Sequence, residues 1–293
     1  MLLLALLACA DPTDEPADSA PTGPQEEADV LTYVPPSYTP QAPQRLVFLG
    51  DSITAGEGEN DWDLLYKELL QENVRRWRGF DDIDLESVWP DLTDVVDVSR
   101  AGATTDTLLS SQLPRLEEQL TFPAVGETIV VFTVGGNDLQ AALVPTSDPV
   151  ELANAVLDKV GDIVAWLQDP ARFPDGVHIY ATNVYEPTDG TGQHPDCFYG
   201  ISYTDRIPVL EDYNDRLRQL GEDMGFSVVD LRGHFLGHGY YRNDPTHPAF
   251  HGDDPTLWLL EDCIHPNKRG HHEVRRLFFH AITDTPLMHV LPQ

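Results

Sequence analysis

Short apolar runs alternate with amphipathic segments along most of this chain, and this alternation constrains the fold more than any other feature. The apolar runs have the length of buried strands, and the segments between them place apolar residues at helical spacing. The predicted strands span 46–49, 95–98, 128–134, 177–182 and 226–230, and the predicted helices span 62–77, 105–120, 149–167, 207–224 and 267–282. Strands that alternate with helices form a parallel sheet covered on both faces. We therefore predict an α/β fold with a flavodoxin-like, doubly wound sheet of about five strands.

The chain before residue 45 has a different character. Residues 1–8 are apolar and Cys9 follows them, so the run ends in Leu-Leu-Ala-Cys and is similar to a bacterial lipoprotein signal. Residues 10–44 are rich in Pro, Asp, Glu, Ser and Thr, and such a segment buries too little apolar surface to offset the entropy of ordering it. We predict a signal segment over 1–9 with Cys9 lipidated, a disordered acidic linker over 10–44, and one folded domain over 45–293. The protein is then exported, as a cell-envelope lipoprotein or an extracellular protein. The alternative is an apolar terminus that is not an export signal.

The chain is strongly acidic, and this limits its partners. It has 49 Asp and Glu residues against 18 Lys and Arg residues, a formal net charge of −31. Such a surface repels the phosphates of nucleic acids and of anionic lipid headgroups. We therefore exclude nucleic-acid binding and expect membrane contact only through the predicted lipid anchor. The sequence defines no oligomeric state, and a monomer is the default expectation.

Residues that can carry chemistry follow three of the predicted strands. The segment Gly-Asp-Ser-Ile-Thr at 50–54 comes directly after the first strand, Gly102 follows the second, and Gly-Gly-Asn-Asp at 135–138 follows the third. Functional loops gather at the carboxyl ends of parallel strands. A serine there is a candidate nucleophile if a base lies near, and Asn amides or Gly N–H groups can hold an oxyanion. Taken singly, each segment is equally typical of an ordinary turn.

A candidate base lies near the end of the chain, in the segment Asp-Cys-Ile-His-Pro-Asn at 262–267. Pro266 suits the first turn of the last predicted helix, which places His265 at the edge of the sheet. Asp262 can accept the Nδ1 proton of His265, and this leaves Nε2 free to take a proton from Ser52. An ordinary surface loop is the alternative for this segment by itself.

Together, the order Ser, Gly, Asn and Asp-x-x-His resembles the SGNH hydrolases, also called GDSL esterases and lipases. The similarity covers residues 45 to 282, with the family blocks at 50–54, 102, 135–138 and 262–265. The resemblance implies a three-layer α/β/α sandwich and a carboxylic ester hydrolase that uses neither a metal ion nor an organic cofactor. It implies that Ser52 is the nucleophile that forms an acyl-enzyme, that His265 is its base, and that Asp262 orients His265.

The resemblance also implies an oxyanion hole made by the main-chain N–H groups of Ser52 and Gly102 and the side chain of Asn137. We assign structural roles to Asp51 and Asp138, which match the family blocks as well. The common α/β-hydrolases fit less well, because their nucleophile lies in Gly-x-Ser-x-Gly and here Thr54 stands two residues after Ser52.

Two cysteines remain in the predicted folded domain, Cys197 and Cys263. In an exported protein they can pair. A disulfide would then tie the loop of Asp262 and His265 to the loop over 195–203; two free thiols are the alternative.

For the substrate, we expect a small-molecule or lipid ester with a short or medium acyl group. The alternatives are a polysaccharide O-deacetylase of the same fold, which acts on acylated carbohydrate, and a non-catalytic binding lipoprotein. Aromatic residues in predicted loops, such as Tyr185 and Trp258, are candidates for an acyl pocket or a sugar platform, with ordinary packing as the alternative.

A metal-dependent hydrolase is a further alternative, because histidines are frequent between residues 234 and 272. His234 and His238 are four residues apart, and so are His247 and His251. Gly237 and Pro248 interrupt these pairs, and the sequence contains no His-Glu-x-x-His motif. We therefore expect no metal site.

Overall fold

The computed structural model describes residues 40–58, 65–75, 92, 94–140, 148–195, 197, 200 and 202–283. The predicted signal segment over 1–9, with Cys9, and most of the predicted linker lie outside these ranges. The end of that linker is predicted wrongly, because strand β1 (Pro43–Gly50) already begins at Pro43. The main-chain N–H groups of Gln41 and Ala42 also bind the Glu127 carboxylate, at 2.9 and 2.7 Å. The folded part therefore starts at least four residues before residue 45.

Five parallel strands form a single sheet in the order β2-β1-β3-β4-β5. Besides β1, these strands are β2 (Asp94–Asp97), β3 (Glu127–Thr133), β4 (Val177–Thr182) and β5 (Ser227–Val229). The chain runs outward from β1 to β2 and then returns to β3 on the other side of β1. Connections therefore diverge between β1 and β3, and in open parallel sheets ligands bind at such a switch point. The predicted flavodoxin-like sheet is confirmed.

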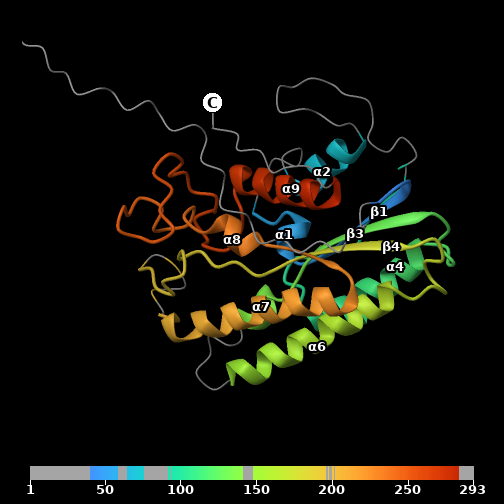
Figure 1. Cartoon of the computed structure of the whole chain (residues 1–293), viewed down its shortest axis with the longest axis horizontal. Coiled ribbons are helices and arrows are strands. Elements are labelled where there is room, and N and C mark those ends of the chain that lie inside the picture. The colour runs from blue at the N-terminus through green and yellow to red at the C-terminus, as the bar shows by residue number, and fades with distance from the viewer. Residues whose placement is uncertain are drawn as a thin grey trace, which may run out of the picture.

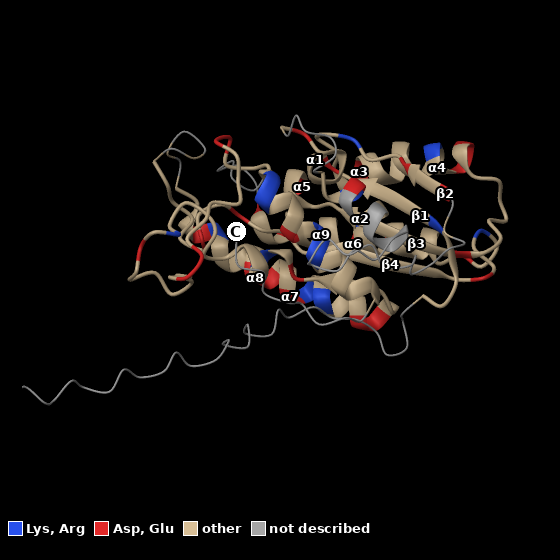
Figure 2. Cartoon of the chain, turned by 90° about the horizontal axis from the view of Figure 1, so that it is seen from above, with Lys and Arg blue, Asp and Glu red and all other residues tan. Residues whose placement is uncertain are grey.

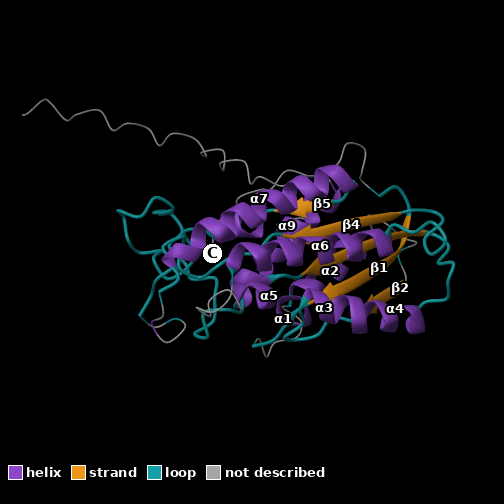
Figure 3. Cartoon of the chain, turned by 90° about the horizontal axis from the view of Figure 1, so that it is seen from below, coloured by secondary structure: helices purple, strands orange, loops and turns teal. Residues whose placement is uncertain are grey.

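Both faces of the sheet are buried because alternate residues of the central strands are apolar on both sides. In β1, Val47 and Leu49 pack into one core, while Leu46 and Phe48 pack into the core on the opposite face. Helices α2 (Tyr66–Arg75), α8 (Leu231–Phe235) and α9 (Lys268–Thr283) cover one face, and α4 (Leu113–Gln119), α6 (Pro149–Leu167) and α7 (Ile207–Met224) cover the other (Figures 1 and 3). This is the three-layer α/β/α sandwich that the family resemblance implies.

The longest helices have clear local signals at their ends. Asp148 caps α6 by accepting the main-chain N–H groups of Val150 and Glu151, and Pro149 occupies the first turn. Helix α7 ends at Gly225, whose φ of 73° is the left-handed conformation that glycine adopts without a steric penalty. Both helices have the bounds that the periodicity predicts.

The predicted helix over 105–120 is helical from Thr105 to Gln119, but it differs in detail from the prediction. A π-helical turn, Leu108–Gln112, joins α3 (Thr105–Thr107) to α4. Pro114 therefore lies in the first turn of α4 and does not interrupt a single α-helix. A proline lacks the N–H that an α-helix interior requires, and the wider π turn before it removes that requirement.

Charged residues lie mainly on the helices and loops around the sheet, and the strands carry few of them (Figure 2). Within the described ranges, no helix has the length and apolar character needed to cross a membrane.

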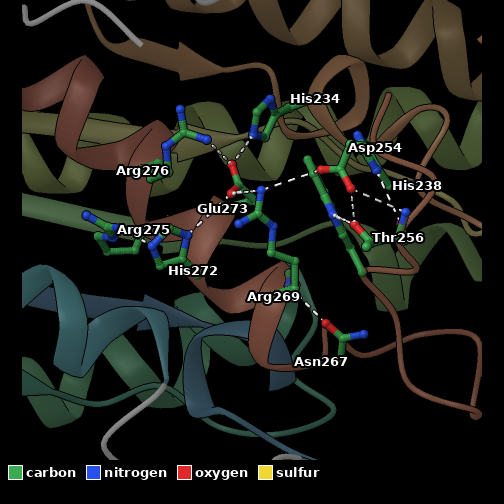
Figure 4. A network of polar contacts seen from close by, with 12 residues as sticks. His234, His238, Asp254, Thr256, Asn267, Arg269, His272, Glu273, Arg275 and Arg276 are labelled. Carbon is green, nitrogen blue, oxygen red and sulfur yellow. Dashed lines mark hydrogen bonds and ion pairs between the residues drawn. The ribbon is translucent and has the colours of Figure 1, made fainter. Parts of the chain in front are cut away.

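One group of charged residues lies in the interior of the protein. Glu273 of α9 has no exposed surface, and it contacts His234 Nε2 at 2.9 Å, Arg276 Nη1 at 2.6 Å and Arg269 Nη2 at 3.2 Å (Figure 4). Arg269 also reaches Asp254 at 3.5 Å. This network ties α9 to α8 and to the segment that leads into the loop of Asp262 and His265.

The network sets the ionisation of Glu273. Burial acts to raise the pKa of Glu273, but the hydrogen bonds from His234 and His272 and the charge of Arg276 outweigh burial and hold it well below its ordinary value of 4.5. A carboxyl group with a depressed pKa stabilises the fold fully above its unfolded pKa, and this stabilisation declines as the pH falls below that value.

We predict that Glu273→Gln lowers the free energy of unfolding at pH 7 by about 3 to 5 kcal/mol, because it leaves buried cations without a counter-charge. The difference from the wild type should shrink between pH 5 and about pH 3. Urea unfolding of the variant and the wild type at pH 7, at pH 5 and at about pH 3 measures this difference. The matched control is Glu118→Gln, an exposed residue on α4, which should change the free energy by less than about 0.5 kcal/mol. A Glu273→Gln protein as stable as the control at pH 7 would contradict this account.

Candidate active site

Ser52 is the first residue of the short helix α1 (Ser52–Ala55), which follows β1 directly. Asp51 caps this helix: its Oδ1 accepts the Ile53 N–H at 3.1 Å and the Thr133 hydroxyl at 2.7 Å. Burial raises the pKa of Asp51 to about 6, although these two hydrogen bonds act against the rise. Asp51 therefore holds the turn that presents Ser52 and ties it to β3, which is a structural role.

The backbone immediately before Ser52 is fixed on both sides. Gly50 has a φ of 121°, and a Cβ there would lie 2.3 Å from the Thr133 carbonyl oxygen, so only glycine fits. The Gln112 side chain accepts the Gly50 N–H and donates to the Gly50 carbonyl, each at 2.8 Å. Gln112 lies in the π turn, and sequence reasoning missed it because no motif marks it.

His265 and Asp262 form a close pair. Asp262 Oδ2 lies 2.6 Å from His265 Nδ1, and Asp262 Oδ1 accepts the main-chain N–H groups of Ile264 and His265 at 2.9 Å each. Partial burial acts to raise the pKa of Asp262, but the hydrogen bonds from His265 and Ile264 outweigh it and lower the pKa. Asp262 therefore stays ionised and fixes the ring, as the Asp-x-x-His spacing predicts.

Several contacts place this pair beside the end of α1. His265 Nε2 lies 3.8 Å from the Glu57 carboxylate, and a Cβ at Gly58 would lie 3.5 Å from His265 Cβ. Ser52 and Ile264 line the same cavity. Nε2 is buried and has no hydrogen-bond partner among the described residues, so it makes no hydrogen bond to Ser52 in this structure. Catalytic hydrogen bonds of this kind are often long without substrate and shorten when it binds.

The residues expected to hold an oxyanion lie on neighbouring loops. Asn137 belongs to α5 (Gly136–Gln140), and its Nδ2 donates to the Ala103 carbonyl at 2.9 Å, which puts it next to Gly102. An amide nitrogen carries two hydrogens, so one remains for a ligand. Gly102 has a φ of 72°, and no atom beyond its chain neighbours would lie within 4 Å of a Cβ there.

Asp138, the other acid of the family blocks, binds the start of α3. Its carboxylate accepts the main-chain N–H of Thr105 at 3.0 Å and the Thr105 hydroxyl at 2.6 Å. It therefore anchors the start of α3 to α5.

A disulfide joins Cys197 to Cys263, within the loop that carries Asp262 and His265. Cys263 has a φ of 61°, which is unfavourable for a residue with a side chain and which the surrounding contacts must maintain. The Tyr185 hydroxyl donates to the Ile264 carbonyl, and the Tyr240 hydroxyl donates to the Leu260 carbonyl at 3.2 Å. The loop is thus held from several sides.

A cavity of about 150 Å³ opens beside Ser52. Its lining comes from β3, α5, the segment after β4, the start of α7 and the loop at Cys263 and Ile264. Tyr185 lines it, as one alternative from the sequence suggests. Trp258 is instead buried, with its ring stacked on His238 at a centroid distance of 3.5 Å.

The histidines that suggested a metal site contact other residues. His234 binds Glu273, and the rings of His238 and His251 stack with centroids 5.0 Å apart. Burial and the proximity of His251 lower the pKa of His238 to about 4. Among the residues that the structure describes, no group of three or more His, Cys, Asp or Glu is placed to hold a metal ion.

The fold and this site define a hydrolase with a serine, a histidine and an aspartate at the edge of a parallel sheet. The model of the GDSL-like Lipase/Acylhydrolase family matches residues 48–273, and the chain belongs to that family. It is a carboxylic ester hydrolase of the esterase and lipase type. No match was found among curated proteins.

Solved structures with the same fold include three enzymes of low sequence identity. An α/β hydrolase enzyme from the metagenome of Lake Arreo is 20% identical with a TM-score of 0.53, over 84% of this chain and 97% of that one. An acetylxylan esterase from Geobacillus stearothermophilus is 17% identical with a TM-score of 0.53, over 85% and 97%. A further acetyl xylan esterase is 17% identical with a TM-score of 0.55, over 81% and 99%.

We predict that the double variant Cys197→Ser/Cys263→Ser loses about 2 to 4 kcal/mol of unfolding free energy, because the open chain regains conformational entropy. The catalytic rate should fall as well, since His265 lies two residues from Cys263. Urea unfolding and ester hydrolysis measure the two effects. Dithiothreitol should lower the stability and the catalytic rate of the wild type in the same way, and it should change neither quantity in the variant. Unchanged stability and turnover in both proteins would show that the bridge has no part in holding the loop.

Proposed function

We propose that the chain hydrolyses carboxylic esters of short or medium acyl length through an acyl-enzyme on Ser52. The Ser52 hydroxyl transfers its proton to His265 Nε2 as its oxygen bonds to the ester carbonyl carbon. The ester C–O bond breaks, and the leaving alcohol takes the proton from Nε2. Water then attacks the acyl-enzyme with His265 as its base, and the carboxylic acid and free Ser52 result.

The observation that carries this proposal is how the two ring nitrogens of His265 are hydrogen-bonded. Asp262 engages Nδ1 at 2.6 Å, which orients the ring and stabilises the imidazolium that forms during proton transfer. Nε2 has no hydrogen-bond partner among the described residues, and it lies beside the helix that begins with Ser52. The ring is therefore prepared to exchange a proton on that side only.

Three N–H donors stabilise the negative charge that develops on the carbonyl oxygen of the ester. As the first residue of α1, Ser52 has a main-chain N–H without a partner inside the helix. We assign the other two donors to the Gly102 N–H and to the free hydrogen of Asn137 Nδ2. One such donor is typically worth ~10²- to 10³-fold in rate.

A second candidate is the removal of acetyl groups from polysaccharides. The acetyl xylan esterases among the structural neighbours favour it. Both candidates use the same bond cleavage and the same residues, and they differ in the acyl group and in the alcohol.

We predict that Ser52→Ala lowers kcat for p-nitrophenyl esters by at least ~10³-fold while the protein stays folded, because the nucleophile is lost. Asp262→Asn should lower kcat by about 10²- to 10⁴-fold, since the ring loses its orientation. Ser110→Ala, at an exposed position in the π turn, is the matched control. A serine-directed phosphonate should label the wild type and the control but leave Ser52→Ala unlabelled. Retained turnover in Ser52→Ala would refute the serine mechanism.

A further inference from the structure

Most of the surface of the cavity beside Ser52 is apolar, and much of it comes from aliphatic side chains of elements far apart in the sequence. They include Val134, Leu139, Val184, Ile207, Val209 and Leu210. The lining also includes three charged residues, and each has partners of its own. Asp51 accepts the Ile53 N–H and the Thr133 hydroxyl, Glu186 accepts the Thr188 N–H at 2.8 Å, and Arg206 pairs with Asp205 at 3.4 Å. The space next to the nucleophile is therefore suited to hydrocarbon.

The position of His265 decides which half of an ester enters this space. The leaving alcohol must lie at His265 Nε2, because that nitrogen protonates it. The half-exposed Glu57 carboxylate lies 3.8 Å from Nε2, so the alcohol half meets a polar group there. Neither His265 nor Gly102 lines the cavity. The acyl half therefore points into the cavity and the alcohol half points away from it.

The cavity walls are held in place before any ligand binds. Asn214 of α7 accepts the Val184 N–H at 3.0 Å and donates to the Val184 carbonyl at 2.9 Å, which fixes this wall to the helix that carries Leu210. On the side of β3, Gly135 packs so closely that a Cβ would lie 2.7 Å from the Tyr213 hydroxyl. A rigid apolar pocket favours a chain that fills it and gains little from a smaller group.

The volume indicates the length of that chain. A cavity of this size, about 150 Å³, lined by aliphatic and aromatic side chains, accommodates a six-carbon guest such as benzene in another protein. An acetyl group would leave most of the space empty. We propose that this cavity is an acyl-chain site and that the enzyme acts on esters of a linear acyl group of about six carbons in preference to acetyl esters. The proposal rests on the proposed function, because it takes Ser52 as the nucleophile.

The test compares p-nitrophenyl acetate, butanoate, hexanoate and octanoate, which share one leaving group, with each kcat/KM divided by the spontaneous hydrolysis rate. Each buried methylene should raise kcat/KM by about fourfold until the cavity is full. We expect hexanoate to exceed acetate by at least about 30-fold. A 4-methylumbelliferyl series should give the same profile if the acyl half sets it.

Leu210→Trp tests the site itself, because it puts a large ring into the cavity from the first turn of α7. The hexanoate-to-acetate ratio should fall by at least about tenfold. Asp215→Trp, an exposed position on the same helix, is the matched control and should leave the ratio unchanged. Circular dichroism and thermal unfolding establish that both variants are folded; if Leu210→Trp is not, Leu210→Phe replaces it.

The outcomes separate this inference from the proposed function. Acetate hydrolysed as fast as hexanoate, with turnover abolished in Ser52→Ala, would overturn the acyl-chain site and leave the serine esterase standing. A ratio that Leu210→Trp does not change would also overturn the site. Turnover that survives in Ser52→Ala would instead overturn the proposed function.

Discussion

The site depends on the parallel order of the sheet, which brings loops from distant parts of the chain to one edge. Because β1, β2 and β3 are adjacent and parallel, the turns after them meet, and they bring Ser52, Gly102 and Asn137 to the same region. The long connection between β5 and α9, which includes α8 (Figure 1), carries His265 in its last part. The apolar cores on both faces hold the sheet, and Asn137 and Asp262 help to fix the loops through hydrogen bonds to the main chain.

Holding His265 is harder, because its loop has no strand of its own directly before it. The chain stabilises this loop by other means: the disulfide at Cys263, the hydroxyl of Tyr185, and the buried charges around Glu273 on the helix that follows. A buried charge network adds little net stability compared with an apolar core, but the loss of one charge leaves the others uncompensated. The network therefore favours one arrangement of the elements that it joins. Here the joined elements are α8, α9 and the segment before the catalytic loop (Figure 4).

Sequence patterns were sufficient for the sheet and for the long helices, and they indicated that the motif residues follow strands. Helices α6 and α7 were predicted with their observed bounds because they are long, amphipathic and marked by Pro149 and Gly225 at their ends. Helices α1, α5 and α8 have four or five residues, too few for a helical period to be detected. The roles of Gln112 and Leu210 could not be predicted, since each depends on a contact between segments that only the folded chain brings together.

In the proposed mechanism, Ser52, His265 and three N–H donors meet at one carbonyl group. A crystal structure of the enzyme inactivated by a hexyl phosphonate tests it most directly, because the phosphorus atom takes the place of the tetrahedral carbon. We predict a covalent bond from Ser52 Oγ to phosphorus, which displaces the leaving group of the inhibitor, and a phosphoryl oxygen within about 3 Å of the Ser52 N–H, the Gly102 N–H and Asn137 Nδ2. His265 Nε2 should lie beside the alkoxy oxygen that the phosphonate retains, which takes the place of the leaving alcohol. Phosphorus attached to another residue, or a phosphoryl oxygen without these donors, would contradict the account.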